Sequence, residues 1–567
     1  MQPSNHRYMM NNSLKLLAVA ALLATTSSCS NFLDINSNPN SLTGSSVTPN
    51  NILAQALTAT AGNYTGNNPS FNSYASWAVG YWGKSGVVSG YGEEITYNYA
   101  TTWGTTQTLF NNVYDNLEDY QFIINQGTNY PNHAAIARIM KSYNFLLLVD
   151  EYGDVPYSQA LQGASNITPT YDKAADIYKD LLVQLDAAIT AINASTNATV
   201  VGTEDVVFGG TMSNWKKFAN SLKLRILMRE SQTGNATLDA SVKAQLTTLQ
   251  SATDGFITAD VLVQPTYTQV AGQQNPFYNR YAYTAAGAAA TERAYQIPTQ
   301  YIIDQYRNNN DPRLTNFYVQ GSRTTTVNGT AVTTADYVGA KPGEQTSPGT
   351  SGNVIASFHQ GADKTTPVTP KGFFKGPNAP TILMMNAELL FLKAEAETRG
   401  LFTGGDAAAQ TDYQNGIIAA FQTAYRVGTA VPVAVPAAPA GSTATGLPEY
   451  NTYIAANTAN TLVAYDKATT TGALGKQAII LYQKYLAMNL LGSTEAWDDY
   501  RRAAQPKLNA SGTKDGYPVS IQSSSSRPDN LPTRVLYPQT EYSTNAANVA
   551  ATGSPNQFTK IFWDVVD

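Results

Sequence analysis

The stretch MNAELLFLKAEAETRG, residues 385–400, predicts a helix with one apolar face. Leu389, Leu392 and Ala396 recur at helical spacing, so we expect them to face the core. The charged residues between them are expected to form exposed pairs, worth only about 0.2–0.5 kcal/mol each. These charged residues are Glu388, Lys393, Glu395 and Glu397.

The same periodicity predicts further helices, which fall into pairs joined by turns. The predicted pairs are 107–126 with 133–149, 172–192 with 213–230, 381–399 with 412–425, and 476–490 with 494–502. Such repeated pairs resemble tetratricopeptide units, although the W-x-x-L-G consensus is missing and the spacing is irregular. Periodicity therefore predicts a mainly α-helical protein, an irregular solenoid with long insertions. Asp498 and Arg502, four residues apart in the last helix, are expected to form another exposed pair.

The insertions between these helices are rich in turn-forming residues. Loop-rich segments are predicted around 63–106, 255–296, 315–380 and 427–470. In one of them, TTVNGTAV places Asn328 and Gly329 between β-forming residues, which predicts a hairpin with a type I′ turn. Because loops on a rigid scaffold often carry function, ligand-binding residues are expected in these segments.

Cys29 is the only cysteine in the chain, and it follows the apolar run LLAVAALLATTSS. A charged start, an apolar run and then small residues form the order of a secretion signal. Small residues directly before a cysteine resemble a bacterial lipobox, although Thr26 stands where leucine is usual. Two lipid attachments on Cys29 would anchor the protein firmly, whereas one acyl chain binds only marginally.

This N-terminal pattern also sets the predicted domain organisation. Residues 1–28 are predicted to be a lipoprotein signal peptide, and the polar, turn-rich segment 29–50 is predicted to be a tether. Residues 51–567 are predicted to form a single domain. No later segment reaches the roughly 20 apolar residues that a membrane-spanning helix needs.

The composition excludes several classes of function. Charged residues make up 13% of the chain and the net charge is −5, so there is no basic stripe for nucleic acid. Outside the signal only His133 and His359 remain, which excludes a His-rich metal site. The chain also lacks a G-x-S-x-G elbow, a phosphate loop and an H-E-x-x-H motif. The many Tyr, Trp, Asn, Thr and Ser residues suit a neutral, hydroxylated ligand.

A family resemblance emerges from seven short motifs that occur in a fixed order behind the lipidation cysteine. They are NFLDINSNPN, YGDVPYSQAL, SNWKKFANSLKLRILMR, DPRL, MNAELLFLKAEAETRG, GSTEAWDDYRRAAQPKL and LPTRVLYPQTEYSTN. In this order they resemble the SusD/RagB family of nutrient-binding outer-membrane lipoproteins of the Bacteroidota. The resemblance runs from Cys29 to about residue 545. Arg534 and Glu541 in the last motif are expected to tie down the final segment.

The resemblance implies a SusD-like fold, with four tetratricopeptide-like pairs on one side and an irregular ligand-binding part packed against them. It implies a lipid-anchored protein of the outer membrane, facing the cell surface. Its partner would be a SusC-like TonB-dependent transporter, over which the protein would sit as a lid with its tetratricopeptide side toward the barrel. The protein would bind a glycan, or a peptide in some members, without cleaving it.

Aromatic residues in the loop-rich segments are the candidates for ligand binding. A sugar can lay its apolar face on an aromatic ring while amides and hydroxyls meet its hydroxyl groups. One cluster lies in a glycine-punctuated stretch where no helix is expected and the rings could point outward. A second cluster lies in the segment NPFYNRYAY. The candidates are Trp77, Tyr81, Trp82, Tyr97 and Trp103 in the first cluster, and Phe277, Tyr278 and Tyr281 in the second.

Two other functions remain open from the residues. A helical scaffold would bind only protein, through its solenoid face. A glycoside hydrolase would need two carboxyl groups about 5–9 Å apart across the sugar. Glu93 and Glu94 are poor candidates because adjacent residues on an extended segment face opposite ways. No cofactor is predicted; Asp254 and Asp260 lie in loops without EF-hand spacing, so a structural calcium ion stays open.

Overall fold

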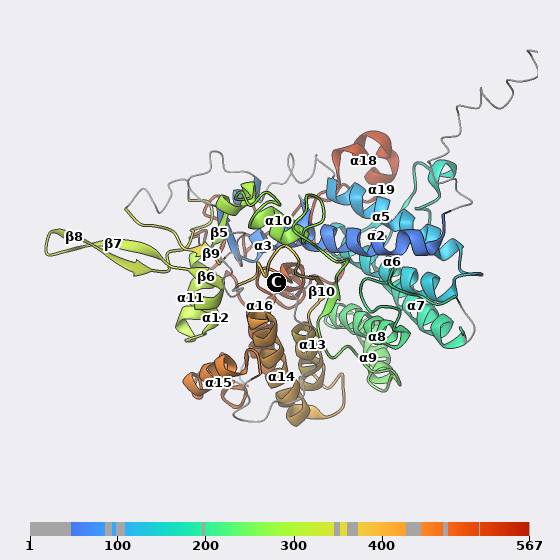
Figure 1. Cartoon of the computed structure of the whole chain (residues 1–567). Coiled ribbons are helices and arrows are strands. Elements are labelled where there is room, and N and C mark those ends of the chain that lie inside the picture. Colours follow the sequence, from blue (N-terminus) through green and yellow to red (C-terminus); the bar gives the residue numbers. More distant parts are fainter. Residues whose placement is uncertain are drawn as a thin grey trace, which may run out of the picture. The chain divides into compact units, whose positions relative to one another are not determined.

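The computed structural model describes most of the chain after the N-terminal segment. The described residues are 47–67, 69–84, 93–97, 108–195, 199–344, 352–359, 372–426, 444–468, 475–509, 511–516 and 518–565. Residues Pro49–Asp567 form one compact unit, which is shown in Figure 1. Residues 1–46 lie outside the described residues. They include the predicted signal peptide, Cys29 and most of the predicted tether.

Eight helices form the four consecutive pairs that the periodicity predicts, and within each pair the two helices pack together. The pairs are α5 (Thr108–Asn125) with α6 (Pro131–Tyr152), α7 (Ala174–Ala194) with α8 (Met212–Arg229), α13 (Asn386–Thr398) with α14 (Gly405–Tyr425), and α16 (Lys476–Met488) with α17 (Ser493–Ala503). The prediction of a mainly helical protein is confirmed. Some boundaries differ: α13 begins only after residues Thr381–Met384, which form a strand.

The remaining helices are shorter on average and lie between or around the pairs (Figure 1). They are α2 (Pro49–Ala61), α3 (Phe71–Ala78), α9 (Ala236–Leu249), α10 (Pro276–Tyr281), α11 (Gln300–Asn308), α12 (Arg313–Phe317), α15 (Leu447–Ala456), α18 (Gln539–Thr544) and α19 (Ala546–Ala551). Helix α3 corrects the expectation that no helix forms in the aromatic stretch, residues 71–104, which holds the first ring cluster. It begins with a capping box in which Ser70 and Ser73 each accept a hydrogen bond from the other's backbone N–H.

Short strands pair as two-stranded ribbons, all antiparallel. The pairs are β1 (Trp82–Lys84) with β5 (Gln296–Pro298), β2 (Val155–Pro156) with β3 (Tyr171–Asp172), β4 (Val261–Val263) with β10 (Thr381–Met384), β6 (Tyr318–Val319) with β9 (Ser357–Phe358), and β7 (Gly321–Val327) with β8 (Thr330–Asp336). Asn328 and Gly329 join β7 to β8 and both have positive φ, 50° and 82°. The predicted type I′ hairpin is confirmed, because that turn needs positive φ at both central residues.

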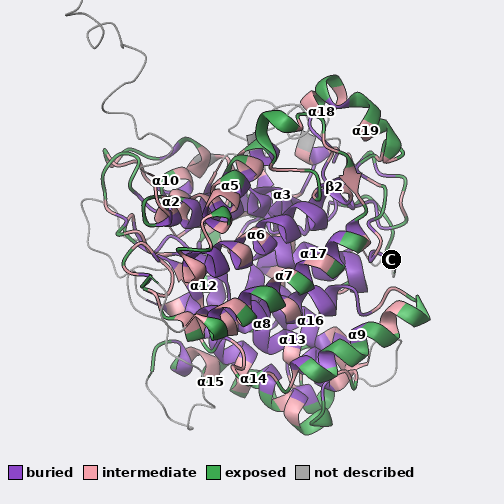
Figure 2. Ribbon diagram, turned by 90° about the vertical axis from the view of Figure 1, so that its right-hand side faces the viewer, coloured by how far each residue is buried: buried purple, intermediate pink, exposed green. Residues whose placement is uncertain are grey.

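The helix pairs enclose a core that is unusual in its polarity. Figure 2 shows buried residues concentrated in the central helices, among them α6, α16 and α17. Every residue of α17 is buried, although its sequence STEAWDDYRRA carries five charged side chains. A helix that is buried all round is normally apolar all round. The charges of α17 must therefore find their partners inside the protein.

Candidate functional site

The predicted ligand-binding rings are buried in the described structure. Seven of the eight fall on described residues, and the most exposed of them, Trp77, has only 6% of its surface accessible. Trp103 lies outside the described residues. The expectation that the first cluster points its rings outward is therefore wrong for the described members, Trp77, Tyr81, Trp82 and Tyr97. That these residues contact a ligand stays a prediction.

Specific contacts explain why these rings turn inward. The Tyr81 ring lies 4.6 Å from the Tyr485 ring of α16, and the Tyr81 hydroxyl donates a hydrogen bond to the Tyr485 carbonyl. The Trp82 ring packs edge-on against Tyr281, 4.9 Å away, so the two predicted clusters meet in the core. The pairing of β1 with β5 holds this segment in place. Tyr81 and Trp82 thus fix the described segment around them to the helical scaffold.

A small cavity lies beside the second cluster. Phe277 and Tyr278 line it together with Lys375 and Arg426, and its volume of about 30 Å³ is enough for roughly one water molecule. Burial, helped by the nearby Arg426 guanidinium, lowers the pKa of Lys375 to about 7. This cavity contains two basic side chains but is too small for a sugar ring.

An open cleft of about 220 Å³ lies between α5, the segment after β2 and α18. Its walls carry the rings of Phe110 and Tyr114, and the carboxylates of Asp115, Glu118 and Glu541 reach it. This volume is below the roughly 300–1,000 Å³ of typical ligand pockets. Sequence reasoning missed the cleft, because Phe110 and Tyr114 show the spacing of ordinary core residues on a helix.

The final segment of the chain is tied down as expected, and it supplies one wall of this cleft. Glu541 accepts a hydrogen bond of 2.7 Å from the Tyr171 hydroxyl. Arg534 is buried, and its carbonyl accepts a hydrogen bond of 3.0 Å from Tyr74 of α3. The backbone N–H of Val535 donates to the Glu151 carbonyl at 2.7 Å.

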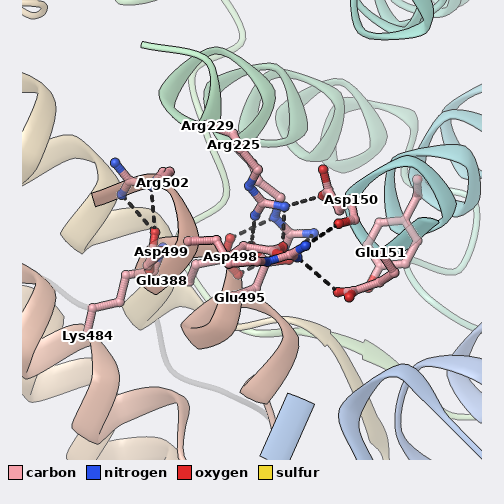
Figure 3. Close-up of polar contacts among 12 residues, drawn as sticks. Asp150, Glu151, Arg225, Arg229, Glu388, Lys484, Glu495, Asp498, Asp499 and Arg502 are labelled. Carbon is pink, nitrogen blue, oxygen red and sulfur yellow. Dashed lines mark hydrogen bonds and ion pairs between the residues drawn. The ribbon is translucent and has the colours of Figure 1, made fainter. Parts of the chain in front are cut away.

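Charged side chains form an ion cluster in the core, where α17 meets its neighbours (Figure 3). Arg229 of α8 forms ion pairs with Asp150 of α6 and with Glu495 and Asp498 of α17. Arg225, one turn earlier on α8, binds both carboxylate oxygens of Glu388, at 2.7 and 2.8 Å. One face of α8 therefore holds α6, α13 and α17 together.

The other end of α17 repeats this arrangement. Arg502 binds both oxygens of Glu395 on α13, at 2.7 and 2.6 Å. Asp499 accepts from Arg502 at 2.9 Å and pairs with Lys484 of α16 at 2.8 Å. Arg501 pairs with Asp498 and donates to the carbonyls of Asp150 and Thr533. The charges of α17 are thus paired on all sides.

These contacts overturn the expectation of exposed charge pairs. Glu388, Glu395, Asp498 and Arg502 are each at most 1% exposed, and Glu397 is also buried. Lys393, the exception, is partly exposed and pairs with Asp412 of α14 at 2.6 Å. Spacing along one helix cannot tell an exposed pair from a buried charge whose partner lies on another helix.

Burial and pairing move the pKa values of these acids in opposite directions. Burial raises the pKa of Asp150 to about 7, although Arg229 opposes the shift, and Asp498 adds to it. Burial also raises the pKa of Glu151 well above its usual value, although Arg501, 3.5 Å away, opposes the shift. For Glu395 burial acts in the same sense, but the contacts with Arg502 outweigh it and hold the pKa below its usual value.

The balance of charge explains this split. Seven carboxyl groups face six cations, namely Asp150, Glu151, Glu388, Glu395, Glu495, Asp498 and Asp499 against Arg225, Arg229, Arg399, Lys484, Arg501 and Arg502. One carboxyl is in excess, so a proton retained on Asp150 or Glu151 neutralises the cluster. Two like charges in a dry site favour this outcome.

Perturbed acids often mark catalytic sites, but this cluster is sealed. Glu151 borders a cavity lined also by Tyr74 and Tyr152, and that cavity has no room for a water molecule. A glycoside hydrolase needs its two carboxyls to reach a sugar and water. The ion cluster is therefore structural.

Four other residues considered for chemistry also have structural partners. His133 is buried, and its Nε2 lies 2.9 Å from Glu204. Glu94 pairs with Lys84, Asp254 with Lys216, and Asp260 with Arg426. Among the described residues no group of three or more His, Cys, Asp or Glu side chains could hold a metal ion. In the described part of the chain, every helix is too short or too polar to cross a membrane.

Comparison with known families decides the classification. Residues 39–538 match the family model described as "Starch-binding associating with outer membrane", SusD-like. The chain belongs to the SusD-like family. The SusD/RagB resemblance and the SusD-like, mainly helical fold expected from it are confirmed. The chain has no match among curated protein sequences.

Solved structures share the fold of this SusD-like protein. A structure described as a chitin-binding protein is 23% identical, with a TM-score of 0.64 over 90% of this chain and 100% of that chain. A SusD homologue from Bacteroides fragilis is 22% identical, with a TM-score of 0.64 over 92% and 100%. A chitin-binding SusD homologue from Flavobacterium johnsoniae is 19% identical, with a TM-score of 0.62 over 90% and 98%. At these identities the likeness shows the fold.

The ion cluster makes the stability of this SusD-like protein depend on pH in a defined direction. Because the folded state raises the pKa of Asp150 from an ordinary value near 4 to about 7, its stabilising contribution is present at low pH and is lost as the pH rises through 7. Asp150→Asn removes this titration. We expect the free energy of unfolding of the variant, relative to the unmodified protein, to rise by roughly 2–4 kcal/mol between about pH 4 and 7.

Urea unfolding of both proteins at a series of pH values measures this difference. Asp176→Asn is the matched control, because Asp176 lies exposed on α7 in a pair with Lys179. Its difference curve shows the effect of removing an exposed carboxylate, with which the Asp150→Asn curve is compared. A relative stability of Asp150→Asn that falls with rising pH would show instead that Asp150 is held ionised by Arg229.

Proposed function

We propose that this SusD-like protein captures a neutral glycan at the cell surface and delivers it to a SusC-like TonB-dependent transporter. The match of residues 39–538 to a starch-binding, outer-membrane-associated family carries the proposal. Two similar structures are described as chitin-binding. Starch and chitin are both polymers of uncharged sugars, and the low charge of this chain suits such ligands.

Binding without cleavage is the activity proposed for the protein. The perturbed acids of the core are sealed from solvent. Glu94 in the aromatic stretch and Asp260 in a loop both form ion pairs. Capture needs only rings and hydrogen-bonding groups held in place. Tyr81 and Trp82, which pack on the scaffold, supply such a support, and Trp103 follows them in the sequence.

Anchoring at the outer membrane through Cys29 is the second part of the proposal. A lipid attachment needs one sulfur atom, which explains why a chain of this length carries a single cysteine. The tetratricopeptide-like pairs would face the transporter, while the aromatic stretch would receive the ligand.

The glycan proposal is tested with a soluble form that starts at Ser30. Native gels containing neutral polysaccharides, chitin-derived and starch-derived among them, measure retardation, and calorimetry with a peptide mixture runs in parallel. We expect retardation by one glycan and at least a tenfold loss of affinity in Trp103→Ala, about 1.4 kcal/mol, because a stacking ring is removed. Tyr542→Ala, a partly exposed ring on α18, is the matched control and is expected to bind normally.

The outcomes of this test separate the remaining functions. Heat released by peptides with no glycan retardation would replace the glycan by a peptide as the nutrient. If the folded protein showed neither retardation by a glycan nor heat with peptides, the function of a helical scaffold that binds only protein would be favoured. Shortening of the glycan during the assay would contradict binding without cleavage.

Lipidation is tested by labelling cells that express the full chain with radioactive palmitate. We expect label on the unmodified protein and none on Cys29→Ala, since no second cysteine is present to accept the lipid thioether. Cys29→Ser is a further control for general effects of the substitution. A Cys29→Ala protein that still carries label would contradict the anchor.

A further inference from the structure

The β7–β8 hairpin extends away from the rest of the compact unit (Figure 1). All residues from Thr330 to Ala335 on β8 are exposed, and Val327 and Val332 are 52% and 39% exposed. An isolated two-stranded hairpin is only marginally stable in water. Its base is secured, because Asp336 accepts from Arg307 at 2.9 Å and from Arg323 at 2.7 Å.

The register shows which backbone groups point out of the hairpin. Val327 pairs with Thr330 across the two-residue turn, and in an antiparallel ladder the hydrogen-bonded pairs then alternate with non-bonded pairs. The residues whose N–H and C=O point outward are therefore Ser322, Thr324 and Thr326 on β7, and Ala331, Thr333 and Ala335 on β8.

The outer edge of β7 is largely occupied. Ser322 exchanges two backbone hydrogen bonds with Val354, at 2.9 and 2.8 Å. The Thr324 N–H donates to the Asn353 side chain at 2.9 Å. These bonds involve residues that the register places on the outer edge, which supports the assignment of outward groups.

The outer edge of β8 has no such cover within the described part of the chain. No described residue forms a hydrogen bond with the outward backbone groups of Ala331, Thr333 or Ala335. Proteins commonly protect an open edge with a charge, a proline or a bulge. Residues 330–335, TAVTTA, contain none of these. Among the described residues nothing covers this edge, and small side chains border it.

We propose that β8 pairs antiparallel with β8 of a second copy of this chain, with Thr333 on the two-fold axis. In this register Thr333 meets its own equivalent, and Ala331 meets Ala335 of the second copy in both directions. Each of these pairs joins residues whose N–H and C=O point outward, so each exchanges two hydrogen bonds. Val332 and Thr334 then lie opposite each other. The segment is thus complementary to itself and brings no like charges together.

The size of this contact sets its strength. One short strand pair buries much less than the roughly 1,200 Å² of a stable interface. The dimer is therefore weak and depends on protein concentration in solution. Anchoring both copies in one membrane would raise their effective concentration and favour pairing. This inference does not depend on which ligand the protein binds.

A cysteine placed on the proposed axis tests the pairing. The soluble form starting at Ser30 contains no cysteine, so Thr333→Cys carries a single thiol. Hydrogen-bonded strand pairs place their Cα atoms about 5.5 Å apart, within the roughly 4.4–6.8 Å that a disulfide spans. We expect mild oxidation to give a covalent dimer. Thr326→Cys, on the outer edge of β7, is the matched control and is expected to stay largely monomeric.

Sedimentation of the cysteine-free protein from micromolar to millimolar concentration provides the second measurement. We expect reversible self-association that Thr333→Pro abolishes, because proline removes an outward N–H without breaking a bond inside the hairpin. An unchanged melting temperature shows that the variant is folded. A monomer at every concentration, or equal dimer yields from Thr333→Cys and Thr326→Cys, would overturn the proposal.

Discussion

The helical scaffold depends on the ion pairs of one buried guanidinium, that of Arg229. This guanidinium joins α8 to Asp150 of α6 and to Glu495 and Asp498 of α17, three acids supplied by segments far apart in the sequence. Removing one partner from such a site leaves a buried charge unpaired, at a cost of roughly 3–5 kcal/mol. The arrangement of the helix pairs is therefore tied to one set of charge contacts.

This constraint separates the scaffold from the loop-rich part that is proposed to meet the ligand. The charged side chains of α17 form ion pairs inside the core. In contrast, Tyr81 and Trp82 of the aromatic stretch are held by ring contacts and a hydrogen bond to α16 and α10.

The sequence predicts the elements that depend on local patterns. It does not predict the direction of side chains whose partners lie far away in the sequence. Helical periodicity predicts the four pairs, and Asn328-Gly329 predicts the hairpin, because both signals lie within a few residues. The spacing of Asp498 and Arg502 suggests an exposed pair, yet Arg502 binds Glu395, 107 residues away. Likewise, the inward direction of Tyr81 depends on Tyr485, and nothing in the local sequence shows that contact.

The account rests on capture of a neutral glycan by a scaffold that performs no chemistry on it. Calorimetric titration of the Ser30 form with defined oligosaccharides of chitin and of starch, followed by measurement of their chain lengths, tests this claim most directly. The account predicts saturable heat with one of the two series and recovery of every oligosaccharide at its original length. Shortened products, or saturable binding of peptides with no binding of either series, would contradict it.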